Sequence, residues 1–296
     1  MEQQKSSKSL KQSTVAKSGL TLHTKEGEFH LGYSRIACFD GCPKAYKYGY
    51  VDGIRTPGGI PMRRGTAYHA VLETLLRHKI EHDGEMLSLD AADKIAVRCA
   101  KKENLTPSEI YKVIDAVRFY HSEMYAKNSP IAVEQDFTIN RGGVKLTGRI
   151  DLVETTGRVI DFKFSYDKWA EPRAKFGSQP MVYQWAGLDY LPKKFKNWHY
   201  TGFGYQIIRL WPSPLIQEID IDMIPQWESD WYEEQIAQIA GCIKAGLFPA
   251  RPSDKGCSWC GHKELCQPAI WNIRMNDTCA TEAETKDSLE DFNDCD

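Results

Sequence analysis

The sequence predicts an α/β fold in which a central sheet is flanked by helices. Apolar residues recur with helical spacing before residue 128, and Val, Ile, Leu and Phe become frequent between residues 130 and 164. Further strand and helix patterns follow up to residue 245, and the sequence contains no internal repeat. The order of predicted elements favours one sheet covered by helices. This order is helices, a strand meander, a helix, two strands and a helix.

The segment before the sheet is predicted to be helical. Ser34 is a candidate N-cap for a short helix that carries Cys38 and Cys42. A second helix, over residues 65–79, is amphipathic and places these apolar residues on one face: Ala67, Val71, Leu72, Leu75 and Leu76. A long helix is expected from about Pro107 to Lys127, because apolar residues recur every three or four positions there.

Three strands are expected at residues 130–139, 144–154 and 158–164, where β-branched and large apolar residues predominate. The sequence Thr155-Thr156-Gly157 is typical of a tight turn and joins the last two strands into a hairpin. The turn therefore brings residues of these two strands alongside one another.

The second half of the chain is predicted to complete the fold. A helix is expected over residues 172–190, followed by strands near residues 201–210 and 215–221. A last helix, from about Pro225 to Ala245, leads into a cysteine-rich segment. These elements supply further strands for the sheet and further helices to cover it.

We expect three regions along the chain. Residues 1–28 are rich in Lys, Ser, Gln and Thr, show little apolar periodicity and are predicted to form a flexible arm. Residues 29–279 are predicted to form a single domain. Residues 280–296 form an acidic tail that we expect to act in solvation, with docking on a partner protein as the alternative.

The composition is that of an ordinary soluble globular protein, with 42% hydrophobic and 26% charged residues. No apolar run approaches the roughly 20 residues that cross a bilayer, which argues against a membrane protein. The N-terminus lacks the apolar core of a secretory signal. We therefore expect a cytoplasmic protein without a membrane partner.

The net charge of −2 hides an uneven distribution. The segment 281–296 holds seven acidic residues and one lysine, which leaves 37 basic and 33 acidic residues in the segment 1–280. That larger part therefore carries a net charge of about +4. This balance permits a nucleic-acid partner without requiring one, because the local placement of charge matters more than the total.

Charged residues inside two predicted strands are the strongest indication of chemistry. Asp161 and Lys163 are two positions apart, so their side chains lie on one face of a strand. Asp151 lies on the preceding strand of the hairpin and is expected to approach Asp161. Two neighbouring carboxylates repel each other unless a cation lies between them, and Mg²⁺ or Mn²⁺ prefers such oxygen ligands. An Asp–Lys ion pair on a solvated strand face is the alternative.

The segment Gly148-Arg149-Ile150-Asp151, followed by Asp161-Phe162-Lys163, resembles the metal centre of the PD-(D/E)XK nucleases in their RecB-like branch. Upstream, residues 64–73 (RGTAYHAVLE) resemble the helix of that branch that carries a metal-binding histidine. Downstream, Gln179-Pro180-Met181-Val182-Tyr183 is similar to its Q-x-x-x-Y motif. The three matches lie in the family's order.

The resemblance implies a PD-(D/E)XK, restriction-endonuclease-like core over roughly residues 33–270. This core has a central mixed sheet flanked by helices, with a helical N-terminal part. The implied metal ligands are three side chains and one backbone carbonyl: His69, Asp151, Asp161 and Phe162. The proline of the family's name is missing before Asp151, a common departure in this branch. Without the resemblance, His69 would be interpreted as a structural histidine.

The resemblance also implies roles for neighbouring residues. Lys163 would be the catalytic lysine, which orients the attacking water or neutralises charge that builds on the phosphate. Gln179 and Tyr183, one helical turn apart, would help to hold the nucleic acid and the Lys163 region. Glu73, one turn from His69, is expected to form a surface ion pair rather than to support the site.

Cys257, Cys260 and Cys266 form a C-x₂-C-x₅-C pattern that favours a soft metal or an iron–sulfur cluster. Cys42 is the best candidate for the fourth ligand, and Cys38 is the alternative. The arrangement resembles the iron–sulfur clasp of the CRISPR-associated RecB-like exonucleases and of AddB-type helicase–nuclease subunits. It implies a [4Fe–4S] cluster that joins the two ends of the domain.

A Cys₄ Zn²⁺ site, in which His262 can replace a cysteine, is the competing interpretation of this pattern. A redox C-x-x-C motif is disfavoured, because a third cysteine is present and the thioredoxin pattern is missing. Trp259 is expected to pack over the cluster rather than to contact a base.

These features predict a Mg²⁺- or Mn²⁺-dependent DNA exonuclease in recombination, repair or CRISPR-type spacer processing. Its preference for the ends of single-stranded DNA follows from the resemblance alone. The sequence has no G-x-x-x-x-G-K-[ST] loop, so unwinding would come from a helicase or recombination protein. The alternative is a non-catalytic DNA-binding recombination scaffold with an iron–sulfur or zinc site. An electron carrier is disfavoured, since it explains neither the paired carboxylates nor Lys163.

Overall fold

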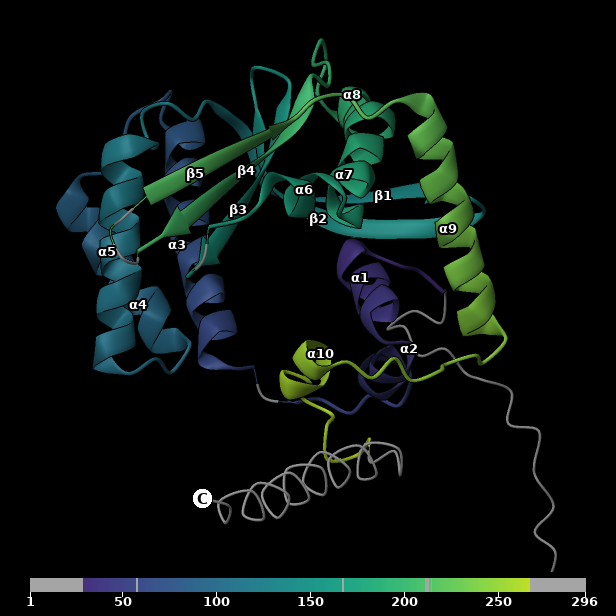
Figure 1. Cartoon of the computed structure of the whole chain (residues 1–296). Coiled ribbons are helices and arrows are strands. Elements are labelled where there is room, and N and C mark those ends of the chain that lie inside the picture. The colour runs from purple at the N-terminus through teal and green to yellow at the C-terminus, as the bar shows by residue number, and fades with distance from the viewer. Residues whose placement is uncertain (1–28, 57, 167, 211–212, 214, 267–296) are drawn as a thin grey trace, which may run out of the picture.

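A computed structural model describes residues 29–56, 58–166, 168–210, 213 and 215–266 of the chain (Figure 1). The described part forms a five-stranded mixed sheet with helices on both faces, which confirms the predicted fold class. The predicted arm, residues 1–28, and the predicted acidic tail, residues 280–296, lie outside the described residues. None of the described helices is long and apolar enough to cross a membrane.

The sheet has its strands in sequence order, from β1 to β5. Every strand pair is antiparallel except β3 with β4, which is parallel. The bounds are β1 (Pro130–Arg141), β2 (Val144–Glu154), β3 (Arg158–Ser165), β4 (Gly202–Arg209) and β5 (Leu215–Ile221). All five predicted strands are confirmed, and only their ends differ by one or two residues.

Two glycine-containing turns set the register of the first three strands. Gly142 and Gly143, with φ of 56° and 68°, form the turn between β1 and β2. Gly157, with φ of 91°, ends the predicted turn between β2 and β3. A side chain at Gly157 would meet the carbonyl oxygen of His199, so the close approach and the left-handed backbone both require glycine.

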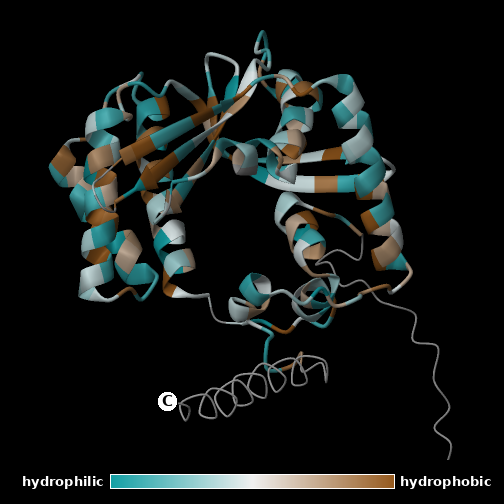
Figure 2. Cartoon of the chain, in the orientation of Figure 1, coloured by the Kyte–Doolittle hydropathy of each residue, from teal (hydrophilic) through white to brown (hydrophobic). Residues whose placement is uncertain are grey.

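Three helices cover one face of the sheet: α3 (Ile60–Glu81), α4 (Leu89–Lys102) and α5 (Pro107–Glu123). Their buried side chains form one core cluster with residues of the strands, and Leu152 and Ile160 belong to it. Figure 2 shows hydrophobic segments along the strands and polar residues over much of the helices. The two predicted helices here are confirmed, although α3 begins at Ile60 rather than at residue 65.

Helix α4 was not predicted from the sequence. Its buried face consists of Ala92, Ala96 and Ala100, with Ile95 and Cys99 packed beside them, and charged residues occupy most of the other face. Its N-cap is clear, because the Ser88 hydroxyl accepts a hydrogen bond from the Ala91 amide at 3.3 Å. The amphipathic pattern and the N-cap were therefore both present in the sequence and were overlooked.

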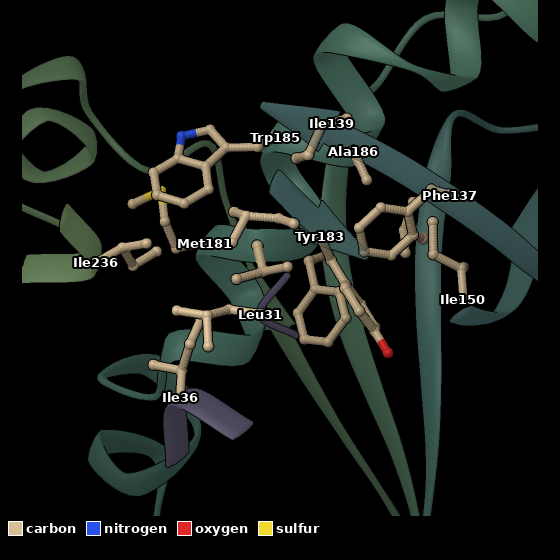
Figure 3. Packing of buried hydrophobic residues seen from close by; sticks show 14 of the residues in the cluster. Leu31, Ile36, Phe137, Ile139, Ile150, Met181, Tyr183, Trp185, Ala186 and Ile236 are labelled. Carbon is tan, nitrogen blue, oxygen red and sulfur yellow. The ribbon is translucent and has the colours of Figure 1, made fainter. Parts of the chain in front are cut away.

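The opposite face is covered by α1 (Tyr33–Gly41), α7 (Ser178–Asp189) and α9 (Gln226–Lys244). Figure 3 shows how their side chains pack with those of β1 and β2, with Tyr183 from α7 beside Phe137 from β1. The single helix predicted over residues 172–190 is wrong. The chain forms α6 (Glu171–Lys175), α7 and α8 (Leu191–Lys194), because Gly177 adopts an extended backbone that separates α6 from α7.

The two ends of the described chain meet beside α1. They comprise α2 (Pro43–Tyr46), a π-helical turn η1 (Lys47–Val51) and α10 (Asp254–Ser258). Figure 1 shows α2 and α10 close together below the sheet. The prediction that one helix carries both Cys38 and Cys42 is wrong, because Cys42 has φ −160° and ψ 107° between α1 and α2. The residue before a proline, here Pro43, is disfavoured in helical conformation.

Candidate active site

Strands β2 and β3 bring the two predicted carboxylates together. Leu152 pairs with Ile160, and the next position along each strand is Asp151 and Asp161 respectively. The backbone N–H of Phe162 donates a hydrogen bond of 2.8 Å to Oδ2 of Asp151, which fixes that side chain against β3. The hairpin therefore holds both carboxylates at one place, as the sequence predicts.

Asp161 is almost completely buried and both of its oxygens have partners. Gln179 Nε2 donates to Oδ1 at 2.5 Å, and Lys163 Nζ lies 2.5 Å from Oδ2. Burial raises the pKa of Asp161 to about 6, although the charge of Lys163 opposes this shift. The repulsion of Asp151 raises the pKa of Asp161 further.

Lys163 is held as a cation. Burial by itself would lower its pKa, but the charge of Asp161 and its hydrogen bond, together with the charge of Asp151, raise the pKa above the ordinary value for lysine. The ammonium group also lies 5.9 Å from the centre of the Tyr205 ring. A protonated lysine can neutralise anionic charge, but it cannot act as a general base.

His69 reaches the carboxylates from α3. Its Nδ1 lies 3.4 Å from Oδ2 of Asp151, and 29% of its side chain is exposed, so the imidazole remains accessible from outside. Desolvation would lower the pKa of His69, but the charges of Asp151 and Asp161 raise it to about 9. A metal ligand has to be a neutral imidazole, so an ion that binds there displaces this proton.

Glu134 on β1 is a residue of the site that the sequence analysis missed. Atoms of His69, Glu134 and Asp151 all lie within 4.8 Å of one another, the one such group of three or more among the described residues. Burial, and then the charge of Asp151, raise the pKa of Glu134 to about 7. The signal was present in the sequence, because the Gly142-Gly143 turn pairs Arg141 with Val144 and so places Glu134 opposite Asp151.

Gln179 and Tyr183 lie on α7 as predicted, and both are buried. The Tyr183 hydroxyl donates to the backbone carbonyl of Arg149 on β2 at 2.8 Å, and Figure 3 shows its ring in the core with the hydroxyl pointing out of it. The Gln179 carbonyl oxygen accepts a hydrogen bond of 3.3 Å from Tyr205 on β4. These two residues tie α7 to the strands that carry the carboxylates.

The donor set suits a hard divalent cation. Carboxylate oxygens and one imidazole nitrogen are ligands that Mg²⁺ and Mn²⁺ accept, whereas soft metals prefer sulfur. Glu73 takes no part, because it pairs with Arg77 at 2.7 Å, as expected from the sequence. The Phe162 carbonyl stays a predicted ligand.

Comparison with known proteins places this arrangement in a family. The sequence profile described as the PD-(D/E)XK nuclease superfamily matches residues 30–267. The chain belongs to this superfamily. Membership supports nuclease activity and divalent-metal dependence, and it agrees with the resemblance found in the sequence. A search of curated protein sequences gave no match.

One solved structure shows the same fold as this nuclease. A Eubacterium rectale protein described as a candidate exonuclease is 14% identical, with a TM-score of 0.54, and the match covers 87% of this chain and 94% of that one. The protein SSO0001 is 16% identical over 76% of this chain and 94% of its own, but its TM-score of 0.29 carries no argument. At these identities the first likeness shows the fold alone.

The nuclease also has a cavity of about 940 Å³ where its two ends meet. Its lining includes five cysteines and a histidine: Cys38, Cys42, Cys257, Cys260, Cys266 and His262. Among the described residues no three of these sulfur atoms lie within 4.8 Å of one another. Four thiolates at about 2.3 Å around one Zn²⁺ ion would lie roughly 3.8 Å apart, so the sulfurs are more widely spaced than in a Cys₄ zinc site.

Backbone groups support the cysteines of the cavity. The amide of Arg251 donates to the sulfur of Cys42, and the amide of Ser253 donates to the sulfur of Cys257, both at 3.4 Å. Burial raises the pKa of Cys266, and the negative charges of Cys42 and the other cysteines raise it further. The cysteines are therefore close enough to interact electrostatically.

The predicted packing of Trp259 over this cavity is wrong. Its side chain is 84% exposed, the highest value among the large hydrophobic residues of the described chain. Trp259 is the C-cap of the short helix α10 and is absent from the cavity lining, to which Gly256 and Cys260 on either side contribute.

Proposed function

We propose that this nuclease is a Mg²⁺- or Mn²⁺-dependent DNA exonuclease that hydrolyses phosphodiester bonds at the ends of single-stranded DNA. The observation that carries the proposal is the meeting of His69, Asp151, Asp161 and Lys163 in one site of a PD-(D/E)XK nuclease. Recombination, repair or CRISPR-type spacer processing is the proposed setting, with a helicase or recombination protein as partner.

The side chains of the site have distinct proposed roles. The metal would be held by three side chains and one carbonyl, those of His69, Asp151, Asp161 and Phe162. When bound, a divalent ion polarises the phosphodiester and lowers the pKa of a water molecule. Asp161 is fixed by Gln179 on one oxygen, so its other oxygen faces Lys163.

Lys163 contributes positive charge. Its raised pKa keeps the ammonium group protonated at neutral pH, and Asp161 fixes its position at 2.5 Å. A fixed cation stabilises the negative charge that builds on the phosphate in the transition state. Tyr183 and Gln179 support this arrangement by joining α7 to β2 and β3.

We propose that Cys42, Cys257, Cys260 and Cys266 hold a [4Fe–4S] cluster. The cavity of about 940 Å³, which all four of these cysteines line, supports the proposal because it has room for a cluster. The amides that donate to the sulfurs of Cys42 and Cys257 supply hydrogen bonds of the kind that tune such clusters. Cys38 also lines the cavity and remains the alternative to Cys42.

Cleavage of single-stranded DNA labelled at its 5′ or 3′ end tests the proposed activity. The full-length protein, prepared anaerobically, is compared with Lys163→Ala in Mg²⁺ or Mn²⁺. We expect Lys163→Ala to reduce the rate at least about 100-fold, because it removes a fixed charge from the transition state. Lys94→Ala is the control, since Lys94 is an exposed lysine paired with Asp90 on α4.

Each result has a definite meaning. Metal-dependent digestion that is lost only in Lys163→Ala supports the proposal, and the label released first gives the polarity. Equal rates in both proteins contradict the assignment of Lys163. An intact protein that binds DNA without cleaving it would favour a recombination scaffold.

A further inference from the structure

Strand β1 supplies an acidic side chain that the proposed ligand set leaves out. We infer that Glu134 is a further ligand of the catalytic metal, beside His69 and Asp151, so that the metal centre draws on β1 as well as on α3, β2 and β3. This inference rests on the proposed function and adds a residue to its metal site.

The distances fit one ion. The donor atoms of Glu134, His69 and Asp151 lie within 4.8 Å of one another, and His69 Nδ1 lies 3.4 Å from Asp151 Oδ2. Around an octahedral ion with bonds of about 2.1 Å, neighbouring ligand atoms lie roughly 3 Å apart and opposite ones roughly 4.2 Å apart. Small side-chain rotations are enough to bring three such atoms onto one centre.

The fold holds Glu134 at this place. Its neighbours Val133 and Gln135 pair with Leu152 and Ile150, the residues that flank Asp151 on β2. Glu134 itself has a φ of 48°, an uncommon value for a residue other than glycine. Strained backbone of this kind persists only where the surrounding structure enforces it.

Among the described residues, the cations near Glu134 are shared with other carboxylates, and His69 lies 3.4 Å from an oxygen of Asp151. Arg149 is near, with Nη1 3.8 Å from Oε2 of Glu134, but its guanidinium donates hydrogen bonds to both oxygens of Asp136 at 2.7 and 3.3 Å. When His69 is neutral, as a metal ligand has to be, Glu134 and Asp151 face each other as like charges across two strands. A divalent cation between them removes this repulsion.

An added carboxylate ligand should increase the affinity of the site for a divalent cation, which can be measured. The affinity of an oxygen-ligand site for a divalent cation rises with the number of charged ligands. We therefore expect Glu134 to contribute to metal affinity itself, independently of the chemical step. Metal binding can be measured without DNA, and so without reference to nuclease activity.

The experiment titrates full-length protein, with its cysteine site loaded equally in all variants, with Mn²⁺. Free Mn²⁺ is followed by electron paramagnetic resonance. We expect Glu134→Gln to weaken Mn²⁺ binding about tenfold or more, and Asp151→Asn to weaken it at least as strongly. Asp136→Asn is the matched control, because Asp136 lies two residues away on β1 and also pairs with Arg149. We expect it to change the affinity less than twofold.

The outcomes separate the inference from the proposed function. If Glu134→Gln and Asp136→Asn both bind Mn²⁺ like the original protein while Asp151→Asn does not, the inference is wrong and the proposed metal site survives. If both carboxamide variants on β1 weaken binding equally, Glu134 acts only through general charge, and the inference is again wrong. If Asp151→Asn also binds normally, the proposed metal site itself fails.

A second variant protects the test against misfolding. Glu134→Asn also removes the carboxylate, but asparagine tolerates the left-handed backbone better than glutamine does. We expect metal-free Glu134→Asn to melt no lower than the original protein at neutral pH and still to lose Mn²⁺ affinity. A folded Glu134→Asn with unchanged affinity overturns the inference.

Discussion

At the scale of single residues, Asp161 shows how the protein prepares a carboxylate for its site. Gln179 and Lys163 each take one of its oxygens, so the side chain cannot rotate freely. Burial favours its neutral form, whereas Lys163 favours the charged form, and the resulting pKa is about 6. The carboxylate is thus charged at neutral pH and fixed in direction.

The pKa of Glu134 makes a prediction about pH and stability. In the protein without metal this pKa is about 7, above the ordinary value of 4.5. Between these two pH values the folded protein therefore keeps a proton on Glu134 that the unfolded chain has released. The contribution of protonated Glu134 to the free energy of unfolding is fully present below about pH 4.5 and is lost as the pH rises through 7. The glutamine in Glu134→Gln does not titrate, so this variant should not lose stability in this way as the pH rises.

Thermal unfolding in the presence of a chelator checks this prediction. The melting temperature of the original protein, relative to that of Glu134→Gln, should fall between pH 4.5 and 7. Asp136→Asn should follow the original protein, because this variant keeps the carboxyl group of Glu134. Parallel pH profiles for Glu134→Gln and the original protein would contradict the stated pKa.

At the scale of elements, strands were predicted better than helices. Alternating and β-branched residues identified all five strands, and the turn at Gly157 identified the hairpin that carries Asp151 and Asp161. Helix α4 was missed although its apolar and charged residues alternate with helical spacing and Ser88 caps it. The role of Tyr205 had no local signal, since it depends on the parallel pairing of β4 with β3.

Two glycines in helices provide a prediction about packing. A side chain at Gly187 on α7 would collide with the ring of Tyr200, whereas Gly241 on α9 has no neighbour within 4 Å of an added Cβ. Gly187→Ala should therefore destabilise the protein by about 1–3 kcal/mol. Gly241→Ala should stabilise it by up to about 1 kcal/mol, because alanine favours helix.

Chemical denaturation measures both changes in the free energy of unfolding. Because α7 also carries Gln179, Gly187→Ala should reduce nuclease activity as well as stability, while Gly241→Ala should not. A stabilising Gly187→Ala would show that Tyr200 moves aside easily, contrary to the packing described.

At the scale of the whole molecule, the cysteine site joins segments that are far apart in the sequence. The Tyr48 hydroxyl donates to the carbonyl of Leu265, 217 residues away, and the Arg251 amide reaches Cys42 across 209 residues. Cross-links that close such long loops restrict the unfolded chain strongly. The spacing of the cysteines in the sequence predicted that these segments meet. The size of the cavity between them could be seen only in the folded chain.

Replacement of one clasp cysteine tests the proposed cluster. Cys260→Ser should lower the iron content and reduce the free energy of unfolding by on the order of 4 kcal/mol, the effect of opening a long cross-linked loop. Cys99→Ser on α4, which lies outside the cavity, is the control and should retain full iron. Elemental analysis that finds zinc in place of iron in the original protein would contradict the cluster.

The meeting of the two ends also determines when this nuclease can be completed during its synthesis. A ribosome that adds about 5–20 residues per second needs roughly 10–40 s to make the 217 residues between Tyr48 and Leu265. During that time the first cysteines have no partners, although the strands that carry Asp151 and Asp161 have already left the ribosome. Loading of the proposed cluster would therefore follow the synthesis of the strands that carry Asp151 and Asp161, and iron supply would limit how much of the protein acquires this link between its two ends.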